Sequence, residues 1–123
     1  VPMPQILIID NNVNMLRNLK KMLEHEGYSV RCATNQRDAL KLYRRRRADL
    51  LITDILMARM EGIQCMNRIR DNAHDIKTIA VSGSGIFSDE EYCQLGELFG
   101  IDATFIKPFL LKDLLGQIKQ MVH

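Results

Sequence analysis

Five polar residues stand where apolar runs of the sequence end, and their types could do chemistry together. They are two carboxylates, one amide, one hydroxyl and one ammonium: Asp10, Asn11, Asp54, Ser82 and Lys107. Carboxylate and amide oxygens can hold a divalent cation, and an ammonium beside them can pair with an oxyanion. If the fold brings these side chains to one place, they form a small polar pocket for a cation and an oxyanion.

Most of these residues also have a purely structural explanation. An aspartate after a strand is often the N-cap of the next helix, and Asn12 or Asn14 could cap the first helix. Lys107 needs a separate explanation, because an ammonium in a partly buried pocket is costly without a carboxylate or phosphate partner. We therefore expect Lys107 to point toward Asp54. Pro108 would fix its presentation, although an ordinary proline at a strand end is the structural alternative.

Short apolar runs alternate regularly along the chain with longer stretches in which apolar residues recur at helical spacing. The runs predict strands at residues 5–9, 28–32, 50–53, 78–82 and 103–106. Between them, the fourth helix has legible ends, with Ser88 and Glu91 at capping-box spacing and Gly100 as its stop. Its apolar stripe, which includes Tyr92, is interpreted as core packing. The last helix is expected to begin just after Pro108 and to run to the end of the chain.

This alternation predicts the α/β class, with one five-stranded parallel sheet, right-handed crossovers and helices on both faces. The 123 residues fit a single domain, residues 1–123. In an open parallel sheet, ligands bind outside the carboxyl ends of the strands, near the point where the strand order reverses. Because all five polar residues stand at the carboxyl ends of strands, we expect them to converge at that edge.

Composition excludes several functional classes. The net charge of +2, from 17 basic and 15 acidic residues, argues against a nucleic-acid surface on this domain. The run Arg44–Arg47 is most simply a solvated helix end, although it could meet phosphate or an acidic partner. Three widely spaced cysteines suggest neither disulfides nor zinc. No membrane span or signal peptide is expected, and a reduced, cytoplasmic location is the default.

Four stretches, "ILIIDN", "DLLITDILMARMEG", "TIAVSGSG" and "FIKPF", carry a resemblance that covers essentially the whole chain. With their spacing, the sequence resembles the receiver domain of bacterial two-component response regulators. The resemblance implies a flavodoxin-like, CheY-like fold with strand order 2-1-3-4-5. It also implies a partner histidine kinase or phosphotransfer protein that donates a phosphoryl group. The expected partner and dimer surface is formed by the fourth helix, the fifth strand and the fifth helix. Members of the family often continue into an output domain after the last helix.

The resemblance also assigns roles to individual residues. Asp54 would be the phosphoacceptor. Mg²⁺ would be held by Asp10, Asn11, Asp54 and the backbone carbonyl of Leu56. Ser82 would be the hydroxyl that turns to the phosphoryl group, and Lys107 would pair with that group.

Several positions depart from the family pattern. Asn11 replaces a second acid, so Mg²⁺ affinity should be weakened. Thr104 stands at the switch position, where an aromatic residue is usual, and Phe105 should point to the opposite face of the strand. Ala58 replaces a proline after Met57, which leaves that loop less constrained.

Leu56 and Ser84 occupy the two variable positions that influence how fast the phosphoryl group is lost to water. An apolar Leu56 cannot orient an attacking water by hydrogen bonding, which predicts slow self-dephosphorylation.

Two other functions stay open from the sequence. Asn11 and Thr104 favour a pseudo-receiver that docks partners without phosphorylation, whereas the complete set of Asp54, Ser82 and Lys107 favours a working phosphoacceptor. A turnover enzyme has little support, because residues 82–85 do not form a G-x-S-x-G elbow and the three histidines lie away from the strand ends.

Overall fold

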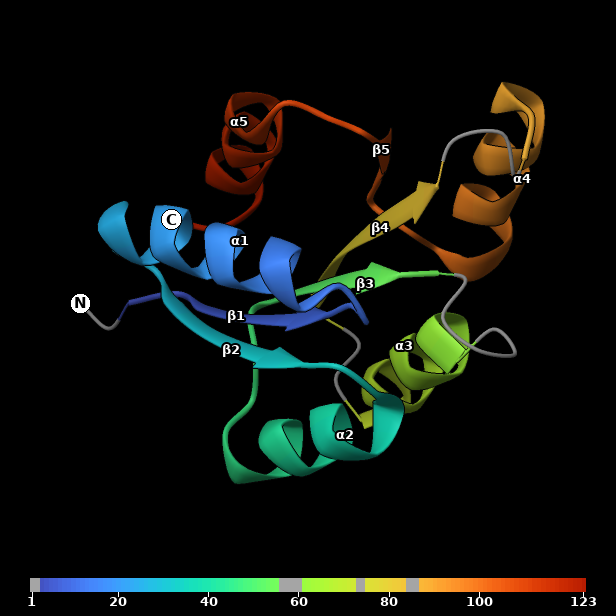
Figure 1. The fold of residues 1–123 in the computed structure, drawn as a ribbon. Coiled ribbons are helices and arrows are strands. Elements are labelled where there is room, and N and C mark those ends of the chain that lie inside the picture. Colours follow the sequence, from blue (N-terminus) through green and yellow to red (C-terminus); the bar gives the residue numbers. More distant parts are fainter. Residues whose placement is uncertain (1–2, 56–60, 73–74, 84–86) are drawn as a thin grey trace.

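The computed structural model describes residues 3–55, 61–72, 75–83 and 87–123. In this part of the chain, strands and helices alternate strictly (Figure 1). The strands are β1 (Gln5–Ile9), β2 (Ser29–Ala33), β3 (Leu50–Asp54), β4 (Lys77–Gly83) and β5 (Ala103–Lys107), and the helices are α1 (Val13–His25), α2 (Gln36–Arg45), α3 (Glu61–Asn72), α4 (Asp89–Phe99) and α5 (Leu111–Met121). The predicted strands are confirmed to within one residue at each end.

The strands form one parallel sheet in the order β2-β1-β3-β4-β5, as predicted. The chain moves outward from β1 to β2 and then crosses back to β3 on the other side of β1. The strand order therefore reverses between β1 and β3, and their carboxyl ends lie side by side at the edge where ligands bind in such sheets.

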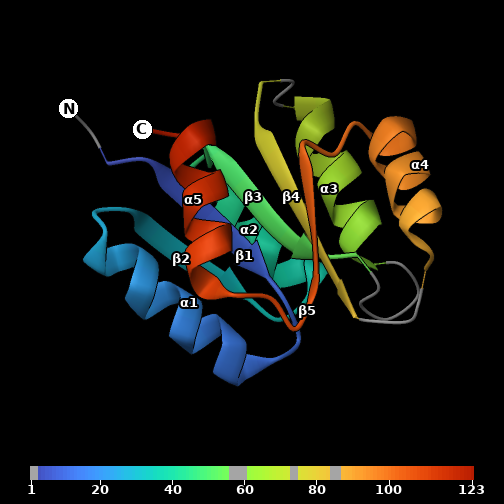
Figure 2. The same ribbon diagram turned by 90° about the horizontal axis from the view of Figure 1, so that it is seen from above.

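Helices cover both faces of the sheet (Figures 1 and 2). Side chains alternate along a strand, so Ile6 and Ile8 of β1 pack with α1 and α5, whereas Leu7 and Ile9 pack with α2 and α3. A smaller third cluster joins the end of β3 and β4 to α3 and α4 through Ile55, Ile63, Ala80 and Tyr92. The core is thus built from two large layers and one small one beside α4.

Helix ends largely follow the predicted signals. Asn12 caps α1, where its side-chain oxygen accepts a hydrogen bond from the Met15 amide at 3.1 Å. Ser88 and Glu91 form the predicted capping box of α4. Gly100 ends that helix with φ 65°, in the left-handed region where a glycine has no Cβ to clash.

The limits of α5 differ from the prediction. The helix begins at Leu111 rather than directly after Pro108, and it ends at Met121 rather than at His123. The flanking residues Leu110 and Val122 have extended backbones, with ψ of 132° and 137°, so neither continues the helix.

The four arginines of residues 44–47 lie at the end of α2 and in the two residues after it. All four are exposed, which confirms the prediction of a solvated helix end. None of the described helices has the length and apolar character needed to cross a membrane.

Candidate functional site

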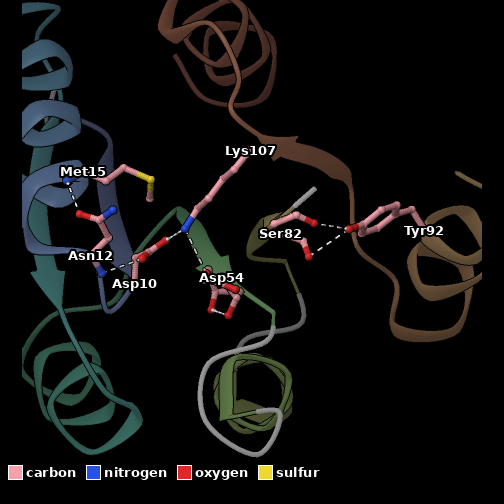
Figure 3. Close-up of polar contacts among 9 residues, drawn as sticks. Asp10, Asn12, Met15, Asp54, Ser82, Tyr92 and Lys107 are labelled. Atoms are coloured by element: carbon pink, nitrogen blue, oxygen red, sulfur yellow. Dashed lines mark hydrogen bonds and ion pairs between the residues drawn. The ribbon is translucent and has the colours of Figure 1, made fainter. Parts of the chain in front are cut away.

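Lys107 joins two carboxylates from two other strands (Figure 3). Its Nζ lies 2.8 Å from Asp10 Oδ2 and 3.1 Å from Asp54 Oδ2. The three residues come from the carboxyl ends of β1, β3 and β5. The expectation that Lys107 points toward Asp54 is confirmed, and the lysine also binds Asp10.

The three side chains differ in their access to solvent. The Asp10 side chain is 1% exposed, that of Asp54 is 14% exposed and that of Lys107 is 26% exposed. Asp10 is therefore an interior anchor. Asp54 is more accessible than Asp10, so it is the carboxylate of this pair that a reagent can reach.

The charge of Lys107 is held by its neighbours. Burial alone would lower the pKa of this lysine, but hydrogen bonds and charge attraction from Asp10 and Asp54 outweigh burial and raise the pKa above its ordinary value of 10.5. The ammonium is therefore protonated at neutral pH. Two carboxylates and one ammonium leave the cluster with a single net negative charge.

The chain turn after β1 holds Asp10 from its other side. Asp10 Oδ1 accepts a hydrogen bond from the backbone N–H of Asn12 at 2.8 Å, and Asn12 in turn caps α1. Both oxygens of Asp10 thus have a donor. Asn11, between these two residues, is exposed to solvent at the rim of the site.

The backbone of Asp54 is held closely by α3. A Cβ placed on Gly62 would overlap the carbonyl oxygen of Asp54, so only glycine fits at this point of α3. The hydroxyl of Thr53 donates to the same carbonyl oxygen at 3.2 Å. The sequence contains Gly62 within the stretch "DLLITDILMARMEG", but its contact with Asp54 could not be inferred without the fold.

Ser82 is fully buried at the end of β4 and its hydroxyl interacts with α4. The Tyr92 hydroxyl donates to Ser82 Oγ at 3.1 Å and also lies 3.0 Å from the Gly83 carbonyl oxygen. Figure 3 shows Ser82 directed toward Tyr92, on the side away from Lys107. Sequence reasoning assigned Tyr92 only to the core stripe of its helix, and no periodicity could have identified this hydrogen bond.

The residues of β5 next to Lys107 point to opposite faces, as predicted. Phe105 packs against the core cluster of α1 and α5 and meets Phe109 edge-on, with ring centroids 5.7 Å apart. Thr104 instead lines a cavity between α4 and β5 together with Tyr92. The other predicted residues, Leu56, Met57, Ala58 and Ser84, lie outside the described residues.

The oxygen donors at this edge fit a hard divalent cation such as Mg²⁺, which prefers carboxylate and carbonyl oxygens. Asp10 and Asp54 face one another across Lys107, with exposed Asn11 beside them. Among the described residues, no group of three or more His, Cys, Asp or Glu side chains is arranged to hold a metal. The donor set therefore suits Mg²⁺ in kind but has a low charge.

Comparison with known proteins points to one family. The family model of the response regulator receiver domain matches residues 6–119. Response regulator MprA of Mycobacterium leprae (strain TN) is 28% identical over 119 residues, which cover 97% of this chain and 51% of that protein. The chain spans about half the length of the curated relatives it matches.

Solved structures of receiver domains have the same fold as this chain. A response regulator receiver domain protein (CheY-like) from Methanospirillum hungatei JF-1 has a TM-score of 0.85 at 29% identity, covering 97% of this chain and 93% of that one. The chemotaxis protein CheY4 of Vibrio cholerae, at 23% identity, has the same fold with a TM-score of 0.87, covering 98% of this chain and 100% of that one. The chain therefore belongs to the response regulator receiver domain family of two-component signalling systems.

Proposed function

We propose that Asp54 accepts a phosphoryl group from a phosphohistidine of a partner kinase or phosphotransfer protein. The observation that carries this proposal is the position of Lys107 Nζ, 3.1 Å from Asp54 Oδ2. An ammonium held beside an accessible carboxylate can stabilise the negative charge of a phosphoryl group during its transfer. In this proposal the chain is a signalling module that accepts one phosphoryl group on itself, rather than an enzyme that turns over a substrate.

The transfer forms one covalent bond and breaks another. A carboxylate oxygen of Asp54 attacks phosphorus, and the bond between phosphorus and the histidine nitrogen breaks. The electron pair of that bond stays on the imidazole, which leaves as a neutral ring when its other nitrogen carries a proton. Lys107 stays bound to Asp10 and turns its positive charge toward the phosphoryl oxygens. Asp10, whose two oxygens already have donors, keeps the lysine in place.

Asp10, Asn11, Asp54 and the Leu56 backbone carbonyl would hold Mg²⁺. When bound, this cation supplies positive charge that offsets repulsion between the carboxylate and the phosphoryl oxygens. Lys107 already neutralises one of the two carboxylates, and Asn11 adds an oxygen without a charge. We therefore expect weak Mg²⁺ affinity compared with a site that has a second acid at position 11.

The output surface of the proposed switch is formed by α4, β5 and α5. Apolar side chains are exposed there, in β5 (Ile106, 37% exposed) and at the start of α5 (Leu110 and Leu111). Exposed apolar residues grouped on one side of a domain are typical of a protein-docking surface. This surface would contact an output partner or a second copy of the chain when Asp54 is phosphorylated.

Phosphorylation-independent docking would use the same surface. The closed cluster of Asp10, Lys107 and Asp54 favours the phosphoacceptor, because a docking module has no need for an ammonium held between two carboxylates. Burying such charges is costly unless they are paired.

Mass spectrometry of the intact protein after incubation with acetyl phosphate and Mg²⁺ tests the proposal. The wild type should gain one phosphate and Asp54→Asn should gain none. Asp75→Asn is the control, because it removes an exposed carboxylate just before β4, at the opposite edge of the sheet. A wild type that stays unmodified, or an Asp54→Asn variant that is modified like the wild type, would contradict it. Loss of the phosphate within seconds would contradict slow self-dephosphorylation.

A further inference from the structure

Tyr92 links the buried hydroxyl of Ser82 to α4. Its side chain is buried, its hydroxyl donates to Ser82 Oγ at 3.1 Å and lies 3.0 Å from the Gly83 carbonyl, and its ring meets Phe87 edge-on at 5.4 Å. In Figure 3 the tyrosine reaches from α4 across to the end of β4. The hydrogen bond to Ser82 therefore connects the end of a central strand to a helix of the proposed output surface.

We infer that Tyr92 is a positioning residue that transmits a change at Ser82 to α4, so that the aromatic member of the switch lies on α4 and not on β5. The inference rests on the proposed phosphorylation of Asp54. It adds that Tyr92 is the residue whose hydrogen bonding changes when the Ser82 side chain turns.

The direction of the Ser82 side chain makes its two contacts alternatives. Its hydroxyl oxygen accepts from Tyr92 and points away from Lys107 (Figure 3), so the side chain must turn before it can reach a phosphoryl group on Asp54. If Ser82 turns toward a phosphoryl group on Asp54, its hydroxyl leaves Tyr92, and the buried phenol keeps only the Gly83 carbonyl as a partner. A buried polar group that loses a partner is destabilised, so Tyr92 and the helix that carries it should adjust.

Space for this adjustment lies next to the ring. A cavity of about 350 Å³ between α4 and β5 is lined by Tyr92, and small residues form part of its wall: Gly96, Ala103 and Thr104. Thr104 leaves this space open because it lacks the volume of an aromatic side chain. Among the described residues, the aromatic side chain that hydrogen-bonds to Ser82 is Tyr92.

Tyr92 is also packed close to the phosphorylation site itself. It shares the small third core cluster with Ile55, the residue that directly follows Asp54. A shift of the β3 end and a shift of Ser82 would therefore act on the same ring. Coupling of this kind needs a side chain with two distinct arrangements, which the hydrogen-bonded and released states of Tyr92 provide.

Carbon-13 NMR of tyrosine ring carbons tests the inference on the wild-type protein. The chain has three tyrosines, Tyr28, Tyr43 and Tyr92, so labelling the hydroxyl-bearing carbon gives three signals, and Tyr92→Phe identifies the one from Tyr92. Beryllofluoride with Mg²⁺ serves as a phosphoryl mimic, and its binding is followed separately by fluorine NMR. The Tyr92 signal should shift on binding, whereas those of Tyr28 and Tyr43 should stay.

The variant Tyr92→Phe keeps the ring and removes the hydroxyl. The hydrogen bond to Ser82 exists only in the unmodified state, so its loss should tighten beryllofluoride binding about fivefold. At the same time, the change in α4 amide hydrogen exchange on binding should fall to less than about half of the wild-type change. Tyr28→Phe is the matched control: it removes the hydroxyl of another buried tyrosine, which donates to the Val122 carbonyl at 3.3 Å, and should change neither quantity.

The outcomes separate the two proposals. If beryllofluoride binds the wild type and the Tyr92 signal does not move, or if Tyr92→Phe keeps the full α4 response, the coupling is wrong and the phosphoacceptor proposal stands. If the wild type binds no beryllofluoride and gains no phosphate, both are wrong. The wild-type measurement decides the coupling even if Tyr92→Phe folds poorly.

Discussion

The centre of the sheet and its β5 side are built differently. All residues of β1 are buried, as are the first four of β3, whereas every residue of β5 is at least partly exposed. β1 and β3 each pair with strands on both sides, but β5 is an edge strand that pairs only with β4. The two carboxylates of the site, Asp10 and Asp54, therefore belong to the closely packed part of the domain, whereas Lys107 belongs to its more exposed part.

This arrangement suits a switch. Asp10 and Asp54 are presented by strands that cannot shift without disturbing two close-packed layers. Tyr92 comes from α4 and lines the cavity between α4 and β5, and Lys107 of β5 directly follows the exposed Ile106. A charge added to Asp54 should therefore displace side chains of α4 and β5 more readily than it displaces the central strands.

The largest expected effect tests the contrast in packing directly. Ile8 of β1 is fully buried and Ile106 of β5 is 37% exposed. Ile8→Ala should lower the free energy of unfolding by about 2–5 kcal/mol, because it removes buried methyl groups and leaves a cavity. Ile106→Ala should lower it by less than about 1 kcal/mol, because part of that side chain is already in water. Urea unfolding measures both, and equal losses would remove the distinction between the two regions.

The next effect concerns the link between the two regions. Lys107→Met should cost about 1–3 kcal/mol in unfolding free energy at pH 7, because it removes the ammonium that lies between Asp10 and Asp54. Lys119→Met is the control. It removes a lysine that is 53% exposed and lies 3.4 Å from Glu26, and exposed pairs of this kind contribute about 0–1 kcal/mol.

The same variant has a defined pH dependence. Since the pKa of Lys107 is raised in the folded protein, its stabilisation is fully present below pH 10.5, the ordinary pKa, and is lost as the pH rises through the raised value. The stability difference between wild type and Lys107→Met should therefore be constant near neutral pH and shrink above pH 10.5. A difference that grows with alkaline pH would contradict this assignment.

The last prediction concerns Mg²⁺ affinity and tests whether Asn11, after β1, is a ligand of the cation. Asn11→Asp should raise Mg²⁺ affinity roughly tenfold, about 1.4 kcal/mol, because it adds a negative charge where the site has few. Asn12→Asp is the matched control. It adds the same charge one residue further along and keeps a good N-cap for α1. Calorimetric titration with Mg²⁺ compares them, and an equal gain in both variants would mean that position 11 is no ligand.

Much of the fold could be predicted because its signals are local. Strand bounds, the capping box of Ser88 and Glu91 and the stop at Gly100 depend on neighbours in the chain. The convergence of Asp10, Asp54 and Lys107 could also be predicted, since the carboxyl ends of parallel strands share one edge. The limits of α5 were less accurate, because the apolar stripe does not show where the backbone becomes extended.

Other features of the site needed long-range contacts. The sequence predicts a contact of Lys107 with Asp54, but the shorter contact, 2.8 Å, is with Asp10, and no local pattern distinguishes the two carboxylates. The hydrogen bond from Tyr92 to Ser82 depends on how α4 lies against β4. The fit of Gly62 against Asp54 depends on the approach of α3.

The amino-acid sequence already defines which chemistry the site can do: two carboxylates, an amide, a hydroxyl and an ammonium stand at strand ends, with one negative charge fewer than a second acid would provide. These properties belong to residue types and to short-range spacing. The three-dimensional structure adds that the ammonium is shared by Asp10 and Asp54, and that Ser82 is held by a tyrosine of α4. Those facts depend on packing between elements far apart in the chain, where shifts of about 1 Å decide whether a hydrogen bond forms.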